Sequence, residues 1–200
     1  ITGNAVRELR KAWSEMTGTD LMLYPGSQET QQAGSIIFRQ EEGCGPEGYH
    51  VFEEGGSVVI AASTDRGWLY GAFELIHQMQ MENPLSGLDV RKEPVMPLRM
   101  LNHWDNMDGS IERGYSGNSF FFEKDEILID ERTVTYARLL ASVGINGAVI
   151  NNVNVKDAAT WLITDRYFDK LRRLSEIFAG YGIKLFLSLN YAAPVELGQL

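Results

Sequence analysis

The chain has 200 residues, of which 44% are hydrophobic and 22% charged, and its net charge is −9. This acidic balance argues against a protein that binds nucleic acid or an anionic membrane, because clustered Lys and Arg bind both. No stretch approaches the roughly 18 apolar residues of a membrane span, and the single Cys44 excludes an intramolecular disulfide. We therefore expect a soluble protein, in the cytoplasm, in the periplasm or secreted after removal of a signal peptide.

The first segment is predicted to be a helix. Its apolar residues recur at spacings of three and four, which places them on one helical face: Val6, Leu9, Trp13 and Met16. Asn4 is expected to cap the start of this helix and Gly18 to end it, and residues 21–24 to form a short strand. Residues 1–4 contain neither an initiating Met nor a signal peptide, so we expect the chain to begin inside a longer protein.

The next residues predict a small sheet. Residues 35–38 are typical of a strand. Residues 48–52 and 57–61 flank Glu53-Glu54-Gly55-Gly56, and two apolar runs joined by such a turn indicate a β-hairpin.

A second helix is expected to cover this sheet. Asp65 is expected to cap it, Gly71 to let it approach the strands, and its inner face to carry Trp68, Ala72, Ile76 and Met79. We therefore predict a small N-terminal α/β sandwich domain over residues 1–83. The lone His50 and His77 are expected to be structural or surface residues.

Residues 84–97 are rich in proline and are predicted to be a linker. Strands and helices alternate after it: strands are expected over 98–102, 147–150 and 183–189, and helices over 131–143 and 164–179. The expected inner faces are Val134, Ala137 and Leu140, and then Phe168, Leu171, Leu174, Ile177 and Phe178. Gly144 is expected to end the first of these helices, and Gly180 or Gly182 the second.

This alternation predicts parallel strands joined by right-handed crossovers. No Gly-rich phosphate loop follows the first strand, which favours a (β/α)8 barrel over a dinucleotide-binding sheet. A barrel needs about 250 residues, whereas 98–200 supplies 103. We therefore predict, for 98–200, the first β-α-β-α-β part of a TIM barrel, truncated after its third strand.

Each predicted strand of the second half runs from apolar into polar residues. The junctions are Leu101-Asn102-His103-Trp104-Asp105, Ile150-Asn151-Asn152-Val153-Asn154 and Leu187-Ser188-Leu189-Asn190. Residues just past the carboxyl ends of barrel strands face the ligand. The sequence therefore predicts a ligand site rich in side-chain amides.

Four stretches carry a resemblance to a known family: residues 65–75, 101–115, 144–154 and 188–194. They resemble the α-glucuronidases of glycoside hydrolase family 67. The resemblance implies an N-terminal α/β domain, a (β/α)8 barrel and a mostly helical C-terminal region. It also implies removal of glucuronic acid, or its 4-O-methyl ether, from xylose in xylan-derived aldouronic oligosaccharides.

The family resemblance implies inversion at the sugar without a metal or other cofactor. The catalytic carboxylates are expected beyond Leu200, so the 200-residue chain alone is expected to be inactive. A homodimer of the full-length enzyme is left open.

Substrate binding is what these residues are expected to supply. The resemblance implies that Trp104 and Val153 line an apolar pocket around the 4-O-methyl group, although Trp104 could also be a core aromatic. Asn152 and Asn154 carry amides that both donate to and accept from hydroxyls. His103 is expected to contact a hydroxyl or to orient a neighbour.

Charged residues of the first junction have two interpretations. Asp105 and Arg113 are candidates for substrate contact, and the Arg113 guanidinium suits a uronic carboxylate. The structural alternative is that Asp105, Asp108 and Glu112 hold loop amides, or that Arg113 pairs with Asp105 or Asp108.

Two further functions remain open on the sequence. A noncatalytic carbohydrate-binding protein would also use Trp and Asn. A barrel glycosidase of another sugar specificity would share the same domain order.

Overall fold

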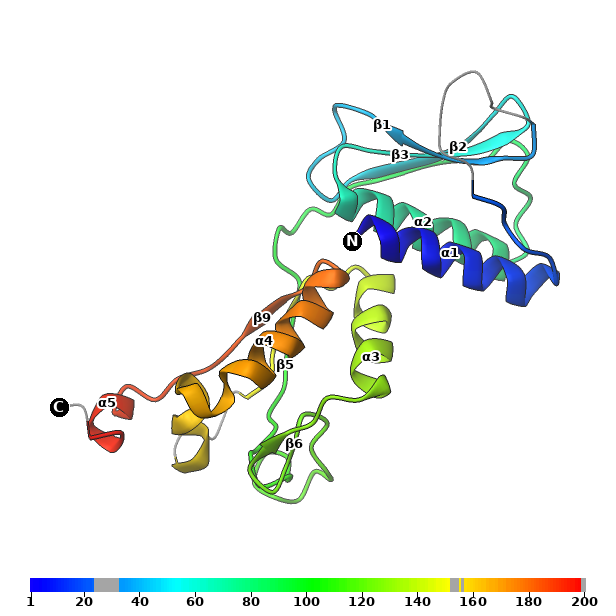
Figure 1. Cartoon of the computed structure of the whole chain (residues 1–200). Coiled ribbons are helices and arrows are strands. Elements are labelled where there is room, and N and C mark those ends of the chain that lie inside the picture. The colour runs from blue at the N-terminus through cyan, green and yellow to red at the C-terminus, as the bar shows by residue number, and fades with distance from the viewer. Residues whose placement is uncertain (24–32, 152–154, 156, 199–200) are drawn as a thin grey trace. The chain divides into compact units, whose positions relative to one another are not determined.

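The computed structural model describes residues 1–23, 33–151, 155 and 157–198. The chain divides into two compact units, Ile1–Pro97 and Leu98–Leu200. Each unit is described by itself (Figure 1).

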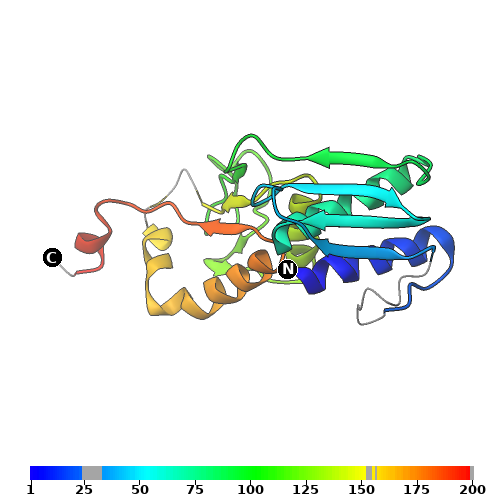
Figure 2. The same ribbon diagram turned by 90° about the horizontal axis from the view of Figure 1, so that it is seen from above.

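Within its described residues the first unit is a mixed sheet with helices on one face (Figures 1 and 2). The strands are β1 (Ile36–Gln40), β2 (Tyr49–Glu54), β3 (Ser57–Ala62) and β4 (Asp89–Lys92), in the order β1-β3-β2-β4. β1 runs parallel to β3, whereas β2 is antiparallel to both β3 and β4. The predicted hairpin of β2 and β3 is therefore confirmed.

Helix α2 (Asp65–Gln80) packs closely on the sheet because glycines line its inner face. A Cβ on Gly71 would lie 2.5 Å from Cγ2 of Ile60, and one on Gly67 would lie 2.4 Å from the Gly48 carbonyl oxygen. The close approach expected from Gly71 is confirmed. The N-cap is Thr64, whose hydroxyl accepts from the Gly67 amide at 3.2 Å, so the prediction of Asp65 as the cap was wrong by one residue.

Helix α1 (Thr2–Thr17) ends, as predicted, at Gly18, whose φ of 71° is a left-handed conformation that glycine adopts without strain. Asn4 lies inside the helix rather than at its cap, because the helix already begins at Thr2. Its buried residues are Ala5, Glu8, Leu9 and Ala12, whereas Met16 is exposed. The inner face predicted from the apolar spacing was therefore partly wrong. Residues 21–23 form no strand, and Tyr24 lies outside the described residues.

The stretch predicted as a linker contains a strand. Asp89–Lys92 form β4, which pairs with β2 from Tyr49↔Lys92 to Phe52↔Asp89. Those residues are therefore part of the sheet of the first unit. The sequence hid this strand because Val90 is its one apolar residue and an edge strand can carry charge on both faces.

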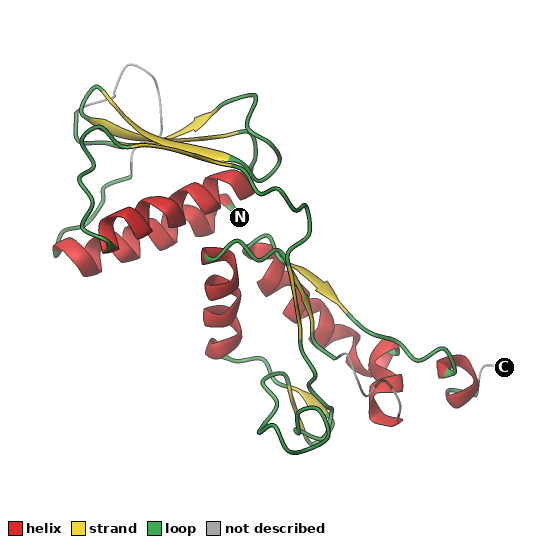
Figure 3. Cartoon of the chain, turned by 180° about the vertical axis from the view of Figure 1, so that it is seen from behind, coloured by secondary structure: helices red, strands yellow, loops and turns green. Residues whose placement is uncertain are grey.

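The second unit contains the predicted parallel strands, shorter than expected (Figure 3). They are β5 (Met100–Asn102), β8 (Gly147–Val149) and β9 (Lys184–Phe186), in the order β5-β8-β9. Both pairings are parallel and place Leu101, Ala148 and Leu185 in one row. The carboxyl ends of these strands consequently lie at the same edge of the sheet.

Helices connect these strands in the expected order. α3 (Glu131–Ser142) lies between β5 and β8, and the 3-10 helix η2 (Asp157–Ile163) and α4 (Asp165–Gly180) lie between β8 and β9. A small hairpin of β6 (Phe122–Glu123) and β7 (Glu126–Ile127) precedes α3, and the short helix α5 (Ala193–Glu196) follows β9. Asp130 caps α3 with a reciprocal capping box to Thr133. No helix in the described part of the chain is long and apolar enough to cross a membrane.

The buried faces of α3 and α4 agree only in part with the sequence pattern. Ala137, Leu140, Leu174 and Phe178 are buried as expected. Phe168 is instead 53% exposed, and its neighbour Tyr167 takes the inner position, with its hydroxyl donating to the Asp125 carbonyl at 2.6 Å. Val134 is also exposed.

Candidate functional site

The segment that follows β5 is fixed through its backbone on both sides. The His103 amide donates to the Val149 carbonyl of β8 at 2.9 Å, which extends the parallel ladder by one residue. On the other side, the Glu112 amide donates to the Trp104 carbonyl at 2.8 Å, and Asp105 bridges to Ile111. Because residues alternate in direction along extended backbone, this fixation decides which side chains point inward.

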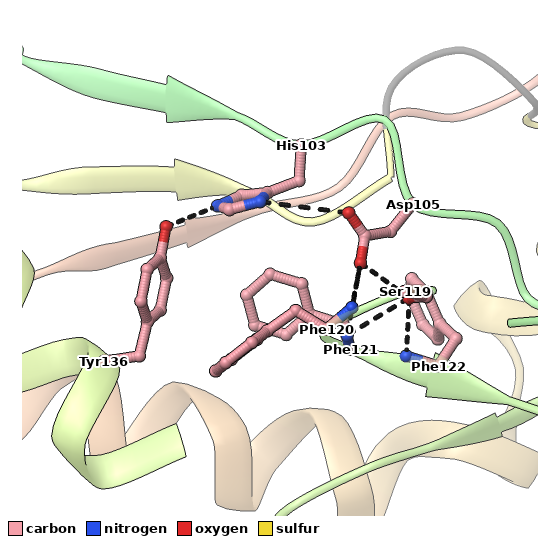
Figure 4. A network of polar contacts seen from close by, with 7 residues as sticks. All are labelled: His103, Asp105, Ser119, Phe120, Phe121, Phe122 and Tyr136. Atoms are coloured by element: carbon pink, nitrogen blue, oxygen red, sulfur yellow. Dashed lines mark hydrogen bonds and ion pairs between the residues drawn. The ribbon is translucent and has the colours of Figure 1, made fainter. Parts of the chain in front are cut away.

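Asp105 points inward and is bonded to a distant loop. Its side chain is 4% exposed. Its Oδ2 accepts from the Ser119 hydroxyl at 2.6 Å, from the Phe120 amide at 2.6 Å and from the Phe121 amide at 3.2 Å (Figure 4). Bonds of this kind to a carboxylate are about twice as strong as neutral ones, so Asp105 ties the strand end to the turn before β6.

Ser119 completes this connection. Its hydroxyl donates to Asp105 and accepts from the Phe121 amide at 3.2 Å and the Phe122 amide at 2.9 Å. The turn thus has its backbone donors satisfied by two side chains, which is the requirement for burying a loop.

His103 also points inward, to helix α3. Its Nε2 lies 2.7 Å from the Tyr136 hydroxyl, and its Nδ1 lies 3.9 Å from Oδ1 of Asp105 (Figure 4). The His103 ring packs edge to face against the Phe121 ring, with 4.9 Å between the two ring centroids. Burial lowers the pKa of His103 below its usual value, although the Asp105 charge opposes the shift. Burial, helped by Asp105, raises the pKa of Tyr136 to about 12. Both groups are therefore neutral at pH 7.

Trp104 lies between these two inward residues and is exposed. The residue keeps 43% of its surface accessible. An indole face that is accessible at a strand end, on a fixed backbone, is a flat apolar surface suited to the C–H face of a sugar ring or to a methyl ether.

The remaining charged candidates of this segment lie in the loop after Trp104. Oδ1 of Asp108 accepts from the Ser110 amide and hydroxyl, at 2.8 and 2.7 Å, so Asp105 and Asp108 both hold loop amides as the structural alternative predicted. Glu112 instead accepts from the Tyr115 and Ser116 hydroxyls. Arg113 is exposed and forms no ion pair with Asp105 or Asp108 within the described residues, so the prediction of such a pair was wrong.

Of the polar residues after β8 that the sequence singled out, the structure describes only Asn151. Asn151 is 1% exposed, donates to the Ser188 carbonyl and accepts from the Ser188 amide, both at 3.1 Å, which links the end of β8 to that of β9. Asn152, Val153 and Asn154 lie outside the described residues.

The sequence singled out His103, Trp104 and Asp105 but not the residues that hydrogen-bond to His103 and Asp105. Ser119 and Tyr136 are 14 and 33 residues from the side chains that they contact. The signal that could have found Ser119 is its place as the polar residue directly before an aromatic run, Phe120-Phe121-Phe122. No group of three or more His, Cys, Asp and Glu in the described ranges is arranged to hold a metal ion.

Comparisons with known proteins decide the family. Residues 78–200 match the glycosyl hydrolase family 67 middle domain. This chain belongs to glycosyl hydrolase family 67. The resemblance predicted from the sequence is thereby confirmed, and the residues of Figure 4 all lie in the family 67 match.

Two curated relatives of this family 67 chain are probable α-glucuronidases A. The protein of Aspergillus oryzae is 45% identical over 210 residues, covering 99% of this chain and 25% of the relative. That of Aspergillus terreus is 39% identical over 209 residues, covering 98% and 24%. The chain thus spans about a quarter of the length of these relatives.

A solved structure resembles the fold of the family 67 chain. It is a GH138 enzyme targeting pectin rhamnogalacturonan II, with a TM-score of 0.60 at 18% identity, covering 99% of this chain and 25% of that one. A likeness at this identity shows the fold alone. The mixed α/β fold is therefore shared with a glycoside hydrolase.

Proposed function

We propose that this chain is part of an α-glucuronidase that removes glucuronic acid, or its 4-O-methyl ether, from xylose in xylan-derived oligosaccharides. Membership of glycosyl hydrolase family 67 and the names of the curated relatives support this activity. The proposed reaction inverts the configuration at the sugar and uses no metal or other cofactor.

The second unit is proposed to begin the (β/α)8 barrel of that enzyme. Strands β5, β8 and β9 are parallel, are joined through helices and lie in chain order within their sheet, as the first strands of a barrel do. The polar residues after β5 and β8 lie at the carboxyl ends of those strands, where barrel enzymes bind their ligands.

Trp104 is proposed to form one wall of the sugar pocket. The observation that carries this assignment is that Trp104 is 43% exposed while the side chains on either side of it point inward, at the carboxyl end of β5. Val153 is proposed to face the same methyl ether, and Asn152 and Asn154 to bind hydroxyls. Arg113, which is exposed, keeps its guanidinium available for an acidic sugar.

The catalytic acid and base are proposed to lie beyond Leu200. Inverting glycosidases need two carboxyl groups about 6.5–9.5 Å apart, with a water between one of them and the sugar. Asp105 does not suit this role because its Oδ2 is already bonded to Ser119, Phe120 and Phe121. Asp108 and Glu112 accept hydrogen bonds within their own loop.

A substrate panel tests the proposal. The full-length enzyme is incubated with aldouronic acids, with unsubstituted xylo-oligosaccharides and with aryl glycosides of other sugars. Release of glucuronic acid from the aldouronic acids alone is expected. Binding of the aldouronic acids without any release would instead favour a noncatalytic carbohydrate-binding protein, and cleavage of a different glycoside would favour another specificity.

A further inference from the structure

The Asp105 network has a property that the proposed sugar contact does not account for. Its members come from separate parts of the second unit: the end of β5, the turn at Ser119–Phe122 and helix α3 through Tyr136 (Figure 4). All of them converge on the residues on either side of Trp104. Trp104, which is exposed, therefore lies between two residues that the network holds in place.

The bonds act on the backbone of Trp104 through its neighbours. His103 is held by the Tyr136 hydroxyl at 2.7 Å and by edge contact with Phe121. Asp105 is held by the Ser119 hydroxyl and the Phe120 amide, both at 2.6 Å. With both neighbours fixed inward, rotation of the intervening peptide would break bonds on both sides. The direction in which the indole leaves the backbone is thus set by the bonds that Asp105 makes to Ser119 and Phe120 and that His103 makes to Tyr136.

We propose that Asp105 is a positioning residue, which binds the Ser119–Phe122 turn and thereby fixes the orientation of Trp104 toward the 4-O-methyl group of the sugar. The proposal rests on the function proposed above for Trp104. It assigns Asp105 to specificity for the methyl ether rather than to contact with the substrate.

The neighbouring carboxylate provides a matched comparison. Asp108 lies three residues further along the same loop, is exposed, and accepts only from Ser110 among the described residues. A neutral Asn at either position removes one charge and keeps the size of the side chain. Only Asp105→Asn weakens the connection between the strand end and the turn.

The first test is a double-mutant cycle in the full-length enzyme, with Trp104→Ala, Asp105→Asn and both together. The measured quantity is the ratio of kcat/KM for methylated over unmethylated aldouronic acid. Asp105→Asn is expected to lower this ratio about three- to tenfold, and to lower it no further when Trp104 is already Ala. Asp108→Asn is expected to leave the ratio within twofold of wild type. An unchanged ratio in Asp105→Asn, or the same loss with and without Trp104, would overturn the proposal.

A second measurement does not depend on turnover. The full-length protein is labelled with 5-fluorotryptophan, and the ¹⁹F resonance of Trp104 is assigned by its loss in Trp104→Phe. Asp105→Asn is expected to shift or broaden that resonance, whereas Asp108→Asn is expected to leave it in place. An unmoved Trp104 resonance in folded Asp105→Asn contradicts the proposal.

Ser119→Ala is a milder variant in case Asp105→Asn fails to fold, because it removes one donor and leaves the carboxylate in place. It is expected to move the same resonance in the same direction, and no movement would count against the proposal. Wild-type enzyme that releases no glucuronic acid would reject the proposed function, but it would leave the ¹⁹F result to decide on Asp105.

Discussion

Replacing Trp104 by Ala in the full-length enzyme measures how much the indole contributes to recognition of the methyl ether. A tryptophan can bury up to about 250 Å². Trp104 keeps 43% of its residue surface accessible, which leaves about 100 Å² for a ligand. A methyl group with the adjoining ring face covers roughly half of it, which at about 25 cal/mol per Å² is worth about 1–2 kcal/mol. Trp104→Ala should therefore lower kcat/KM for the 4-O-methylated substrate about five- to thirtyfold.

The assay compares two substrates and two variants. Steady-state kinetics on methylated and unmethylated aldouronic acids should show a smaller loss for the unmethylated one, and Trp104→Phe should recover part of the difference. A melting curve of each variant detects a loss of stability. Equal losses on both substrates, together with a large drop in Tm, would refute the reasoning and make Trp104 a core aromatic.

The remaining predictions concern stability. Gly71→Ala should destabilise the first unit by about 1–3 kcal/mol, because the new Cβ meets Ile60 at 2.5 Å. Gly3→Ala in the same unit is the control, since a Cβ there meets nothing within 4 Å. A fall in Tm of less than 1 °C for Gly71→Ala would contradict the prediction. Burial raises the pKa of Glu74, but hydrogen bonds from Lys92, Gln78 and Tyr49 outweigh it, and the net shift of the pKa is downward. Glu74→Gln should therefore lower Tm at pH 7, and this difference from wild type should disappear as the pH falls below about 4. A difference in Tm that does not depend on pH would show that the charge of Glu74 is not its cause. Burial lowers the pKa of His103, so the unfolded chain binds more protons and stability falls as the pH drops below about 6.5. The hydrogen-exchange protection factors of residues 103–106, corrected for the intrinsic exchange rate at each pH, should therefore fall between pH 7 and 5 in wild type and change less in His103→Gln. An equal fall in both proteins would show that another group titrates.

The local sequence pattern was sufficient to predict the helices and strands that bury one regular face. After Ser57, β3 is an uninterrupted apolar run, and the strand is buried along its whole length. Gly18 ends α1 at the expected position. The pattern failed where burial depends on partners distant in sequence. β4 has too few apolar residues to be recognised, and its register comes from pairing with β2.

The candidate site also has features that the sequence predicted and features that it did not. Trp104, His103 and Asp105 stand out because polar and aromatic residues directly follow an apolar strand. Their roles did not follow from that pattern, since the inward direction of Asp105 depends on the Ser119 hydroxyl and on amides 15 and 16 residues away. Tyr136 belongs to helix α3, where its spacing marks it as one more residue of a helical face.

The anomer that the full-length enzyme forms first tests the central claim most directly. A proton NMR time course is recorded on an aldouronic acid in which one α-linked 4-O-methylglucuronic acid decorates a xylo-oligosaccharide. The account predicts that the β-anomer of 4-O-methylglucuronic acid appears first, that it then equilibrates with the α-anomer, and that the xylose–xylose bonds remain intact. Initial release of the α-anomer would contradict inversion, and cleavage between xylose residues, or no cleavage at all, would contradict the proposed α-glucuronidase.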